Sequence, residues 1–180
     1  MKDHSKLTGQ VIDQQKASYT KEDTILYALA LGLGSDPADA QQLRYVYEPE
    51  LMALPTMAMV IAYPGFWMKR PEYGFQWQKV LHAEETIEIQ ESIPPEGTLY
   101  GETTVEEVVD RGKEKGCFVY LRKSLRNERG KTIATVLSNT LARGDGGFGS
   151  REAGKSRERM PTPPERAPDH VCDLPSLPQS

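Results

Sequence analysis

One stretch of the sequence contains almost no polar residue, and it limits the possible folds of the chain more than any other. It reads Leu54-Pro-Thr-Met-Ala-Met-Val-Ile-Ala-Tyr-Pro-Gly65. Pro55 suits the first position of a helix, Pro64 suits its end, and the methionine and alanine content favours a helix over a short buried strand. A helix that is apolar on every side must be covered on every side, so other elements have to surround it.

Much of the remaining sequence is typical of β-strands. Apolar residues between positions 81 and 90 share one parity and polar residues the other, as seen in Leu81, Ala83, Ile87 and Ile89 against His82, Glu84, Thr86, Glu88 and Gln90. Further strands are expected over 99–109, 116–126 and 131–142, with a turn at 94–97 and a hairpin at 127–130. An antiparallel meander of about four strands needs a cover for its apolar face. We therefore predict an α+β hot-dog fold, in which an antiparallel sheet wraps around a central apolar helix.

A second helix is predicted over residues 20–32. Thr20 is a candidate N-cap, and Asp23 can complete a capping box with it. Gly32 and Gly34 favour an end to the helix there. An apolar stripe is expected to pack this helix against the rest of the domain, and it consists of Ile25, Leu26, Leu29 and Leu33.

Charge and cysteine content exclude several classes of function. The net charge is −4 and the isoelectric point is about 5.5, so no overall basic field favours a nucleic acid as partner. The N-terminal residues are polar and no apolar run is long enough to span a membrane, so we expect no membrane partner. Cys117 and Cys172 lie far apart, and no Cys/His cluster has zinc spacing. We therefore expect reduced thiols, an intracellular location and no metal site.

The composition changes near Gly144. Residues 149–180 are rich in arginine, glutamate, serine and proline, which predicts a linker or disordered tail. We place a folded domain at 1–149 and the tail at 150–180. The segment 149–156, GSREAGKS, fits the phosphate-loop pattern G-x-x-x-x-G-K-[ST]. No helix with an apolar stripe can follow it, because Pro161 comes soon afterwards, so a solvated linker is the favoured interpretation.

Several short segments can be recognised together. They are YALALG at 27–32, YEPEL at 47–51, LPT at 54–56, VLHAE at 80–84 and RGDGGFG at 143–149. In order and spacing the set resembles the N-terminal half of the MaoC-type (R)-specific enoyl-CoA hydratases, also called hydratase 2. Such enzymes consist of two hot-dog units, and the second unit carries an aspartate and a histidine that activate the water added across the trans-2-enoyl double bond.

The resemblance implies a half without a catalytic site. The family places its catalytic residues in and after a Gly-Asp-x-Asn-Pro motif, which does not occur here, while the segment 171–178 resembles the approach to the second unit. We therefore expect a truncated chain or a separately encoded subunit that binds acyl-CoA as substrate, needs no cofactor, and pairs with a catalytic hot-dog half as a homo- or heterodimer. The implied location is the cytoplasm, or the peroxisome in a eukaryote. Two alternatives stay open: an interaction module that only stabilises a partner, and a self-sufficient single hot-dog thioesterase or dehydratase.

Three positions match family residues near the thioester ligand. His82 and Ala83 stand where the family has a His-Gly pair, and Arg111 stands where a lysine is usual. The resemblance implies that these three residues contact acyl-CoA and that no residue of this chain is catalytic. Alanine in place of glycine could crowd a backbone contact, and arginine keeps the charge of lysine with a different geometry.

Other readings of these residues are open from the sequence alone. A histidine at a strand start is often a surface residue, and the basic run at 111–123 is typical of a solvated hairpin. If β alternation is regular, Glu85 points away from His82 and the two do not converge. Glu84 shares the side of His82, which leaves a catalytic role for that pair open.

Overall fold

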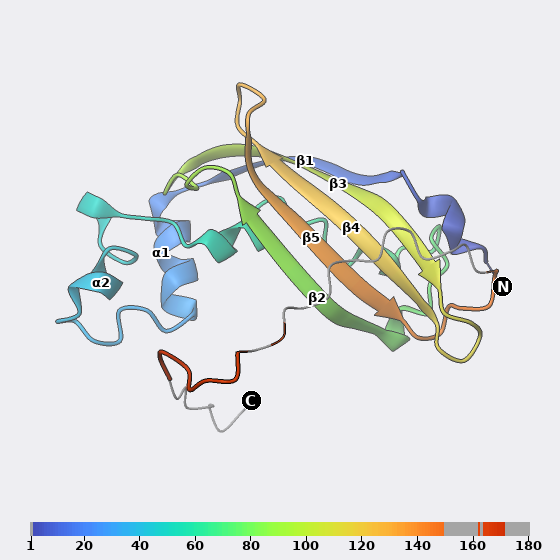
Figure 1. Cartoon of the computed structure of the whole chain (residues 1–180). Helices are drawn as coiled ribbons and strands as arrows, with labels where there is room; N and C mark the ends of the chain where they lie inside the picture. The colour runs from blue at the N-terminus through green and yellow to red at the C-terminus, as the bar shows by residue number, and fades with distance from the viewer. Residues whose placement is uncertain (1, 150–161, 163, 172–180) are drawn as a thin grey trace.

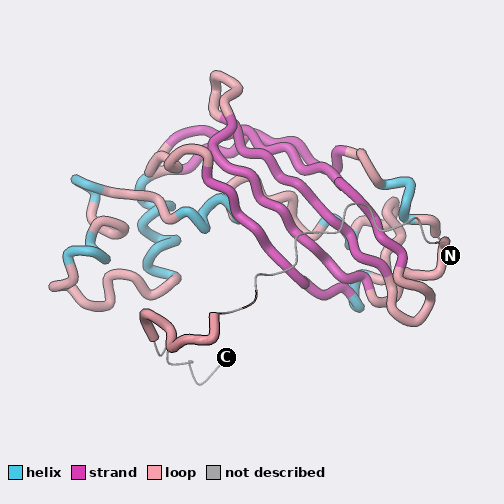
Figure 2. Tube along the Cα trace, viewed as in Figure 1, coloured by secondary structure: helices cyan, strands magenta, loops and turns pink. Residues whose placement is uncertain are grey.

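A five-stranded antiparallel sheet organises the structure, and the helices are short (Figures 1 and 2). The structure is a computed structural model that describes residues 2–149, 162 and 164–171. In the described part of the chain, no helix has both the length and the apolar character needed to cross a membrane. The elements in chain order are η1 (His4–Leu7), β1 (Val11–Tyr19), α1 (Lys21–Ala30), α2 (Ala40–Leu43), η2 (Glu48–Glu50), η3 (Pro55–Met59), η4 (Trp67–Lys69), η5 (Trp77–Lys79), β2 (Val80–Ile89), β3 (Gly97–Asp110), β4 (Cys117–Arg126) and β5 (Thr132–Ala142), where η marks a 3-10 helix.

The strands follow the order β1-β3-β4-β5-β2 across the sheet, and all neighbours are antiparallel. Strands β2 to β5 lie close to their predicted ranges, and the predicted hairpin joins β4 to β5. The expectation of a simple meander is wrong, because β2 pairs with β5 and not with β3. Strand β1 is missing from the prediction. It is an edge strand that buries only Ile12 and Tyr19, so its sequence shows almost no apolar alternation.

Helix α1 begins and ends as the sequence predicts. The Thr20 side chain accepts a hydrogen bond from the N–H of Asp23, and the Asp23 side chain accepts one in return from the N–H of Thr20, which completes the capping box. Just beyond the last turn, Gly32 has a φ of 88°, in the left-handed region that favours glycine. Local sequence signals are therefore sufficient to define both ends of this helix.

The buried side of α1 differs from the prediction. The prediction that the apolar stripe packs against the domain is wrong. Leu26 and Leu29 are exposed, and the helix buries Thr24 and Ala28 instead. The Thr24 hydroxyl donates to the carbonyl oxygen of Pro95 at 2.7 Å. A hydrogen bond and two small side chains thus hold α1 close to the loop before β3, and the larger apolar side chains face outwards.

The apolar segment lies inside the curve of the sheet, as predicted, but it is not a regular α-helix. It forms the 3-10 helix η3 and a turn that continues to Ala62, which has a φ of 50°. A Cβ atom on Gly101 of β3 would lie 2.4 Å from the Cβ of Ala62, so only glycine permits this close approach. The expectation of complete burial is wrong for this chain, since Val60 and Tyr63 are exposed.

Two clusters of buried apolar side chains fill the concave side of the sheet. One surrounds η3 and includes Met57, Ile61 and Leu125. The other surrounds η4 and includes Trp67 and Val119. The sheet curved around this filling is the hot-dog arrangement that the sequence predicts.

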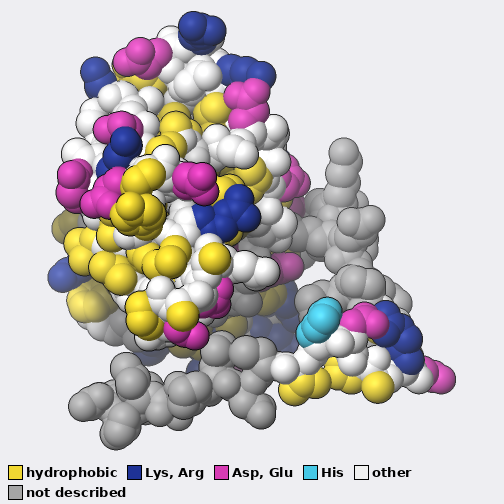
Figure 3. Space-filling view, turned by 90° about the vertical axis from the view of Figure 1, so that its left-hand side faces the viewer, with side chains coloured by type: hydrophobic (Ala, Val, Ile, Leu, Met, Phe, Trp, Pro, Cys, Tyr) yellow, Lys and Arg dark blue, Asp and Glu magenta, His cyan; other side chains and the backbone are white. Residues whose placement is uncertain are grey.

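One edge and one face of the molecule carry apolar groups that no described element covers. Strand β2 is an edge strand, and most of its residues are exposed. Figure 3 shows apolar side chains grouped on the face of the molecule that carries α1. The exposed apolar residues of α1 and its surroundings include Leu26, Leu29, Leu31 and Val60. Free strand edges and large apolar patches are normally covered in soluble proteins. No described element covers the β2 edge or the α1 face, which leaves both accessible to another chain.

Candidate functional site

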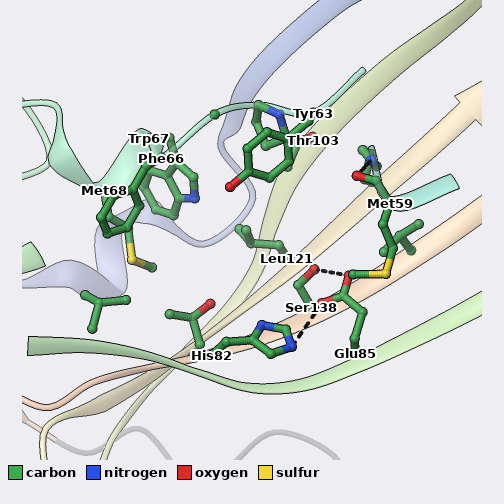
Figure 4. Close-up of a pocket in the computed structure, with 16 residues that line it drawn as sticks. Met59, Tyr63, Phe66, Trp67, Met68, His82, Glu85, Thr103, Leu121 and Ser138 are labelled. Atoms are coloured by element: carbon green, nitrogen blue, oxygen red, sulfur yellow. Dashed lines mark hydrogen bonds and ion pairs between the residues drawn. The ribbon is translucent and has the colours of Figure 1, made fainter. Parts of the chain in front are cut away.

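A pocket of about 470 Å³ lies between the concave face of the sheet and the segment that follows η3 (Figure 4). Its volume is within the range of small-molecule sites. We call its two sides the aromatic wall and the strand wall. The aromatic wall consists of Met59, Tyr63, Pro64, Gly65, Phe66, Trp67 and Met68. The strand wall consists of Val80, His82, Glu85, Thr103, Leu121, Lys123, Val136, Ser138 and Thr140.

A β-bulge in β2 brings His82 and Glu85 to the same wall. His82 lies opposite Thr140 of β5, Glu84 lies opposite the preceding residue of β5, and Ala83 is the additional residue between them. The alternation of the strand reverses at this point, so Glu85 lines the pocket and Glu84 is exposed. The predictions that Glu85 diverges from His82 and that Glu84 accompanies it are wrong, because both assume an uninterrupted alternation.

Glu85 is the centre of a small polar cluster. The Ser138 hydroxyl donates to its Oε1 at 2.7 Å, and the Nε2 of His82 lies 3.7 Å from its Oε2 (Figure 4). The side chain of Glu85 is 16% exposed and that of His82 is 61% exposed, so the imidazole lies towards the opening. A histidine beside a carboxylate is a possible proton-transfer pair, but a hydrogen bond between the two would require a shorter distance.

Lys123 is the buried cation of the site. Its ammonium group donates to the carbonyl oxygens of Met59 at 2.8 Å and Ile61 at 2.9 Å, and so ties β4 to the segment after η3. Only 5% of the residue is exposed. Burial lowers the pKa of Lys123 to about 8, and the nearby Glu85 carboxylate acts in the opposite direction. This lysine therefore helps to hold the two walls of the pocket at a fixed separation.

The structure divides the three predicted ligand contacts between two places. His82 lines the pocket, and Ala83 adjoins it in the bulge. Arg111 lies in the loop after β3, where its guanidinium is 5.2 Å from the ring centre of Phe118. It borders a separate, open hollow beside Asp110. The contact of these three residues with acyl-CoA stays a prediction.

The glycine-rich segment after β5 encloses the carboxylate of Asp110. The backbone N–H groups of Gly112, Gly147 and Gly149 donate to this carboxylate at 2.8, 2.7 and 2.8 Å. Burial opposes ionisation, but these donors outweigh it and lower the pKa of Asp110. A Cβ atom on Gly146 would lie 2.3 Å from the carbonyl oxygen of Gly112, so the two loops pack backbone against backbone. We call this arrangement the Asp110 collar, and it accounts for Gly146, Gly147 and Gly149 of the RGDGGFG segment.

Other motifs singled out in the sequence have little support as sites. The phosphate-loop pattern begins at Gly149, whose N–H faces the Asp110 carboxylate, and its remaining residues lie outside the described part. Cys172 also lies outside it. Cys117 is buried in β4, and burial raises the pKa of its thiol to about 12, so it is an unreactive thiol. Among the described residues, no group of three or more His, Cys, Asp or Glu side chains is placed to hold a metal ion.

Sequence reasoning misses part of the strand wall. The basic run at 111–123 is predicted to be solvated, which is wrong for Lys123. A signal for its burial exists in β4, where it shares parity with apolar residues that are all buried, namely Val119, Leu121 and Leu125. Ser138 and Glu85 have no comparable signal, because their positions depend on the register of β5 and on the bulge in β2.

Comparison with known proteins identifies the family. Residues 17–144 match the family described as MFE-2 hydratase 2 N-terminal domain, and the chain belongs to this family. It is 32% identical over 177 residues to enoyl-CoA hydratase ChsH3 from Mycobacterium tuberculosis, which covers 95% of this chain and 59% of that protein. It is 28% identical over 180 residues to peroxisomal multifunctional enzyme type 2 from Mus musculus, covering 96% of this chain and 24% of that protein.

A solved structure supports the fold. The crystal structure of a MaoC-like dehydratase from Phytophthora capsici superposes with a TM-score of 0.70 at 22% sequence identity. The match covers 94% of this chain and 59% of that one. The hot-dog fold is thereby confirmed. The chain spans only part of the length of ChsH3, of the mouse enzyme and of the Phytophthora dehydratase.

Proposed function

We propose that this chain is the N-terminal, substrate-binding half of an (R)-specific 2-enoyl-CoA hydratase, equivalently a 3-hydroxyacyl-CoA dehydratase, of fatty acyl-CoA metabolism. The pocket takes the acyl group, while His82, Ala83 and Arg111 contact the thioester and coenzyme A. The thioester is the substrate, and no cofactor takes part. A second hot-dog unit supplies the aspartate and the histidine for the chemistry, since the Gly-Asp-x-Asn-Pro motif does not occur in these 180 residues.

The observation that carries the proposal is a pocket with an aromatic wall whose opening lies beside His82. Such a wall can bury a hydrocarbon chain, and each buried methylene contributes about 0.8 kcal/mol. His82 is also the residue that resembles a ligand contact of the family. The acyl group and the thioester would then lie in one continuous site.

Strand register supports a role for Arg111 in the same site. Asp110 pairs with Cys117, Cys117 pairs with Ala142, and Ala142 pairs with Val80, so these four residues form one row across the sheet. Arg111 directly follows Asp110 in the sequence, and His82 lies two residues after Val80. Both therefore belong to the same end of the sheet. An extended coenzyme A could reach from the pocket opening to the guanidinium, which suits a phosphate.

The open edge and face support a partner. We propose that a catalytic hot-dog unit, in the same protein or in another subunit, covers the β2 edge and the apolar face around α1. The result is a homo- or heterodimeric pair of hot-dog units without nucleic-acid or membrane partners. The proposed location is the cytoplasm, or the peroxisome in a eukaryote, where the named mouse relative is peroxisomal.

Two alternatives each have one observation in their favour. Exposed leucines on α1 would also suit an interaction module that stabilises a partner without binding acyl-CoA. The proximity of His82 and Glu85 in one pocket would suit a self-sufficient thioesterase or dehydratase. The substrate-binding half is preferred because neither alternative accounts for both the pocket and the family match.

The test compares turnover with binding. The chain alone should hydrate crotonyl-CoA no faster than a buffer blank, followed by the loss of enoyl absorbance. Calorimetry with a non-hydrolysable acyl-CoA should show binding that Arg111→Ala weakens by about 1–3 kcal/mol, the scale of a charge-assisted hydrogen bond. Arg111→Lys should restore part of the affinity, high salt should reduce the effect, and Lys115→Ala in the same loop is the matched control.

Each alternative has its own outcome. Protein-dependent hydration of crotonyl-CoA would overturn the proposal in favour of a self-sufficient enzyme. Absence of acyl-CoA binding even when the chain is stably assembled with a catalytic hot-dog unit would favour the interaction module.

A further inference from the structure

The strand wall of the pocket is more polar than a plain hydrocarbon chain requires. Six of its side chains are polar, and they come from four strands: Thr103 of β3, Lys123 of β4, Ser138 and Thr140 of β5, and His82 and Glu85 of β2. Figure 4 shows His82, Glu85 and Ser138 on the side of the pocket opposite Phe66, Trp67 and Tyr63. Inward-facing positions of a sheet are usually apolar. An alkyl chain would offer no hydrogen bond to any of these groups.

Some of these groups have hydrogen-bonding capacity to spare. The hydroxyls of Thr103 and Thr140 make no hydrogen bond to another described residue. Glu85 uses one oxygen for Ser138, while its other oxygen is 3.7 Å from His82. Leaving a buried hydroxyl without a partner costs about 1–3 kcal/mol. A ligand that displaces water from the pocket binds better if it brings an oxygen of its own.

The charges in the wall indicate that this oxygen is uncharged. The Lys123 ammonium already donates to two carbonyl oxygens, and the Glu85 carboxylate lies nearby, so the wall carries one charge of each sign. A ligand carboxylate would be repelled by Glu85. A hydroxyl fits both requirements, since it can donate to a carboxylate and accept from a threonine hydroxyl.

We infer that the pocket selects acyl thioesters that carry a hydroxyl group on the part of the chain remote from the thioester, in preference to unsubstituted alkyl chains. The aromatic wall packs along the carbon skeleton. The hydroxyl lies against the strand wall, where it donates to Glu85 or pairs with Thr103 according to its position on the chain, since β4 and β5 separate these two residues. This inference rests on the proposed function for the thioester, and it names the substrate class that the site prefers.

Calorimetry on the full chain tests the preference. The ligands are octanoyl-CoA, its 6-hydroxy and 8-hydroxy derivatives, and the derivative with a terminal carboxylate. At least one hydroxyacyl-CoA should bind about 5- to 10-fold more tightly than octanoyl-CoA, as one additional hydrogen bond predicts, and the carboxylate should bind no better than octanoyl-CoA. Thr103→Val is nearly isosteric and should reduce the preference to about twofold or less for a derivative whose hydroxyl reaches Thr103. Thr104→Val, whose residue faces away from the pocket, should keep it.

A second pair of variants guards against a folding defect. Glu85→Met should reduce the preference for a derivative whose hydroxyl reaches Glu85, and Glu84→Met, next to it but exposed, should not. Equal affinity for octanoyl-CoA and both hydroxy derivatives would overturn the inference, as would a preference that survives both Thr103→Val and Glu85→Met.

A probe without coenzyme A separates this inference from the proposed function. NMR spectra of the chain are recorded with 1-octanol and with 1,8-octanediol at equal concentrations. If no thioester binds but the diol shifts the signals of Thr103 and Ser138 more than octanol does, the hydroxyl preference holds and the proposed function fails. If no thioester binds and the diol has no greater effect than octanol, both fail.

Discussion

Two carboxylates at inward positions of the sheet, Asp110 and Glu85, have contrasting surroundings. Asp110 ends β3 and is enclosed by backbone N–H groups from two loops. Glu85 follows a bulge and has one hydroxyl donor, a more distant imidazole, and an open pocket in front of it. The first carboxylate has its hydrogen-bonding capacity filled by the chain itself, and the second does not.

The contrast indicates what each carboxylate does. Backbone donors are held in place by the chain and cannot turn towards a ligand, so the collar stabilises loops. Side-chain donors can reorient, and a partly satisfied charge in a cavity is typical of binding sites. The same reasoning separates Arg111, which stacks on Phe118 outside the pocket, from Lys123, which joins the two pocket walls.

The largest effect is expected at the collar. Asp110→Ala would leave three N–H groups without their acceptor and should lower the free energy of unfolding by about 4 kcal/mol, measured by urea denaturation. Asp110→Asn keeps one acceptor oxygen and should lose less. The pKa of Asp110 is lowered, so its contribution is present above the ordinary carboxyl pKa and is lost as pH falls through the folded-state value.

The contrast between the Asp110 and Glu85 carboxylates fails if the protein is nearly as stable without the Asp110 carboxylate. A loss below about 1 kcal/mol for Asp110→Ala would show that water replaces the carboxylate and that the two carboxylates do not differ in kind. The NMR response to 1-octanol, which needs only the pocket, should be unchanged in Asp110→Asn, because the collar does not line the pocket.

A smaller effect is expected at the pocket lysine, with a defined pH window. Lys123 has an ordinary pKa of 10.5, and burial lowers the pKa to about 8 in the folded chain. Between these values the unfolded chain binds the proton more strongly, so unfolding free energy rises with pH across this window. The difference between wild type and Lys123→Met should therefore rise by about 2 kcal/mol from pH 7.5 to 10.5, since one pKa unit corresponds to about 1.4 kcal/mol and the pocket admits some water.

The unfolding free energy of wild type is compared with that of Lys123→Met because a second group, the thiol of Cys117, titrates in the same pH window. Burial raises the pKa of Cys117 from 9.0 to about 12, so its contribution to stability falls above pH 9 in both proteins. Lys131→Met, on the exposed hairpin, is the control. A flat difference curve for Lys123→Met would show that the pocket is wet enough to solvate the ammonium group.

The smallest effect is expected beyond the collar. Lys155→Ala and Ser156→Ala change the two most diagnostic positions of the phosphate-loop pattern, and both should leave the free energy of unfolding and acyl-CoA affinity unchanged within about 0.5 kcal/mol. Tight binding of ATP and Mg²⁺ that Lys155→Ala abolishes would contradict this expectation and give the end of the collar a function of its own.

The sequence predicts this molecule well where structure is decided locally. Helix caps, the hairpin and the alternation of β3, β4 and β5 depend on neighbouring residues, and these elements are found close to their predicted positions. Prediction fails where tertiary contacts decide. The outward leucines of α1 result from its close packing through Thr24 and Ala28, and the turn after η3 brings Ala62 close to Gly101.

The candidate site could be predicted less completely than the fold. His82 was reachable through a family resemblance, and Lys123 through its parity in β4. Glu85 and Ser138 meet only because register and a bulge combine, and neither can be read from a single strand. The division into a domain at 1–149 and a tail at 150–180 stays a prediction, since most of the tail lies outside the described residues.

The bulge at Ala83 has a consequence for how β2 can change. Removing that one residue would restore strict alternation, and every later side chain would keep its present side, because Glu84 already lies opposite the next residue of β5. Pairing Ala83 with β5 in place of Glu84 would have the opposite effect. Glu84, Thr86 and Glu88 would then turn inwards, while Ile87 and Ile89 would turn towards solvent. The chemical character of this part of the binding surface thus depends on which residue is left unpaired as well as on the residues of the strand. A shift of pairing by one position would rewrite the specificity of the site in one step, without substituting any residue that touches a ligand.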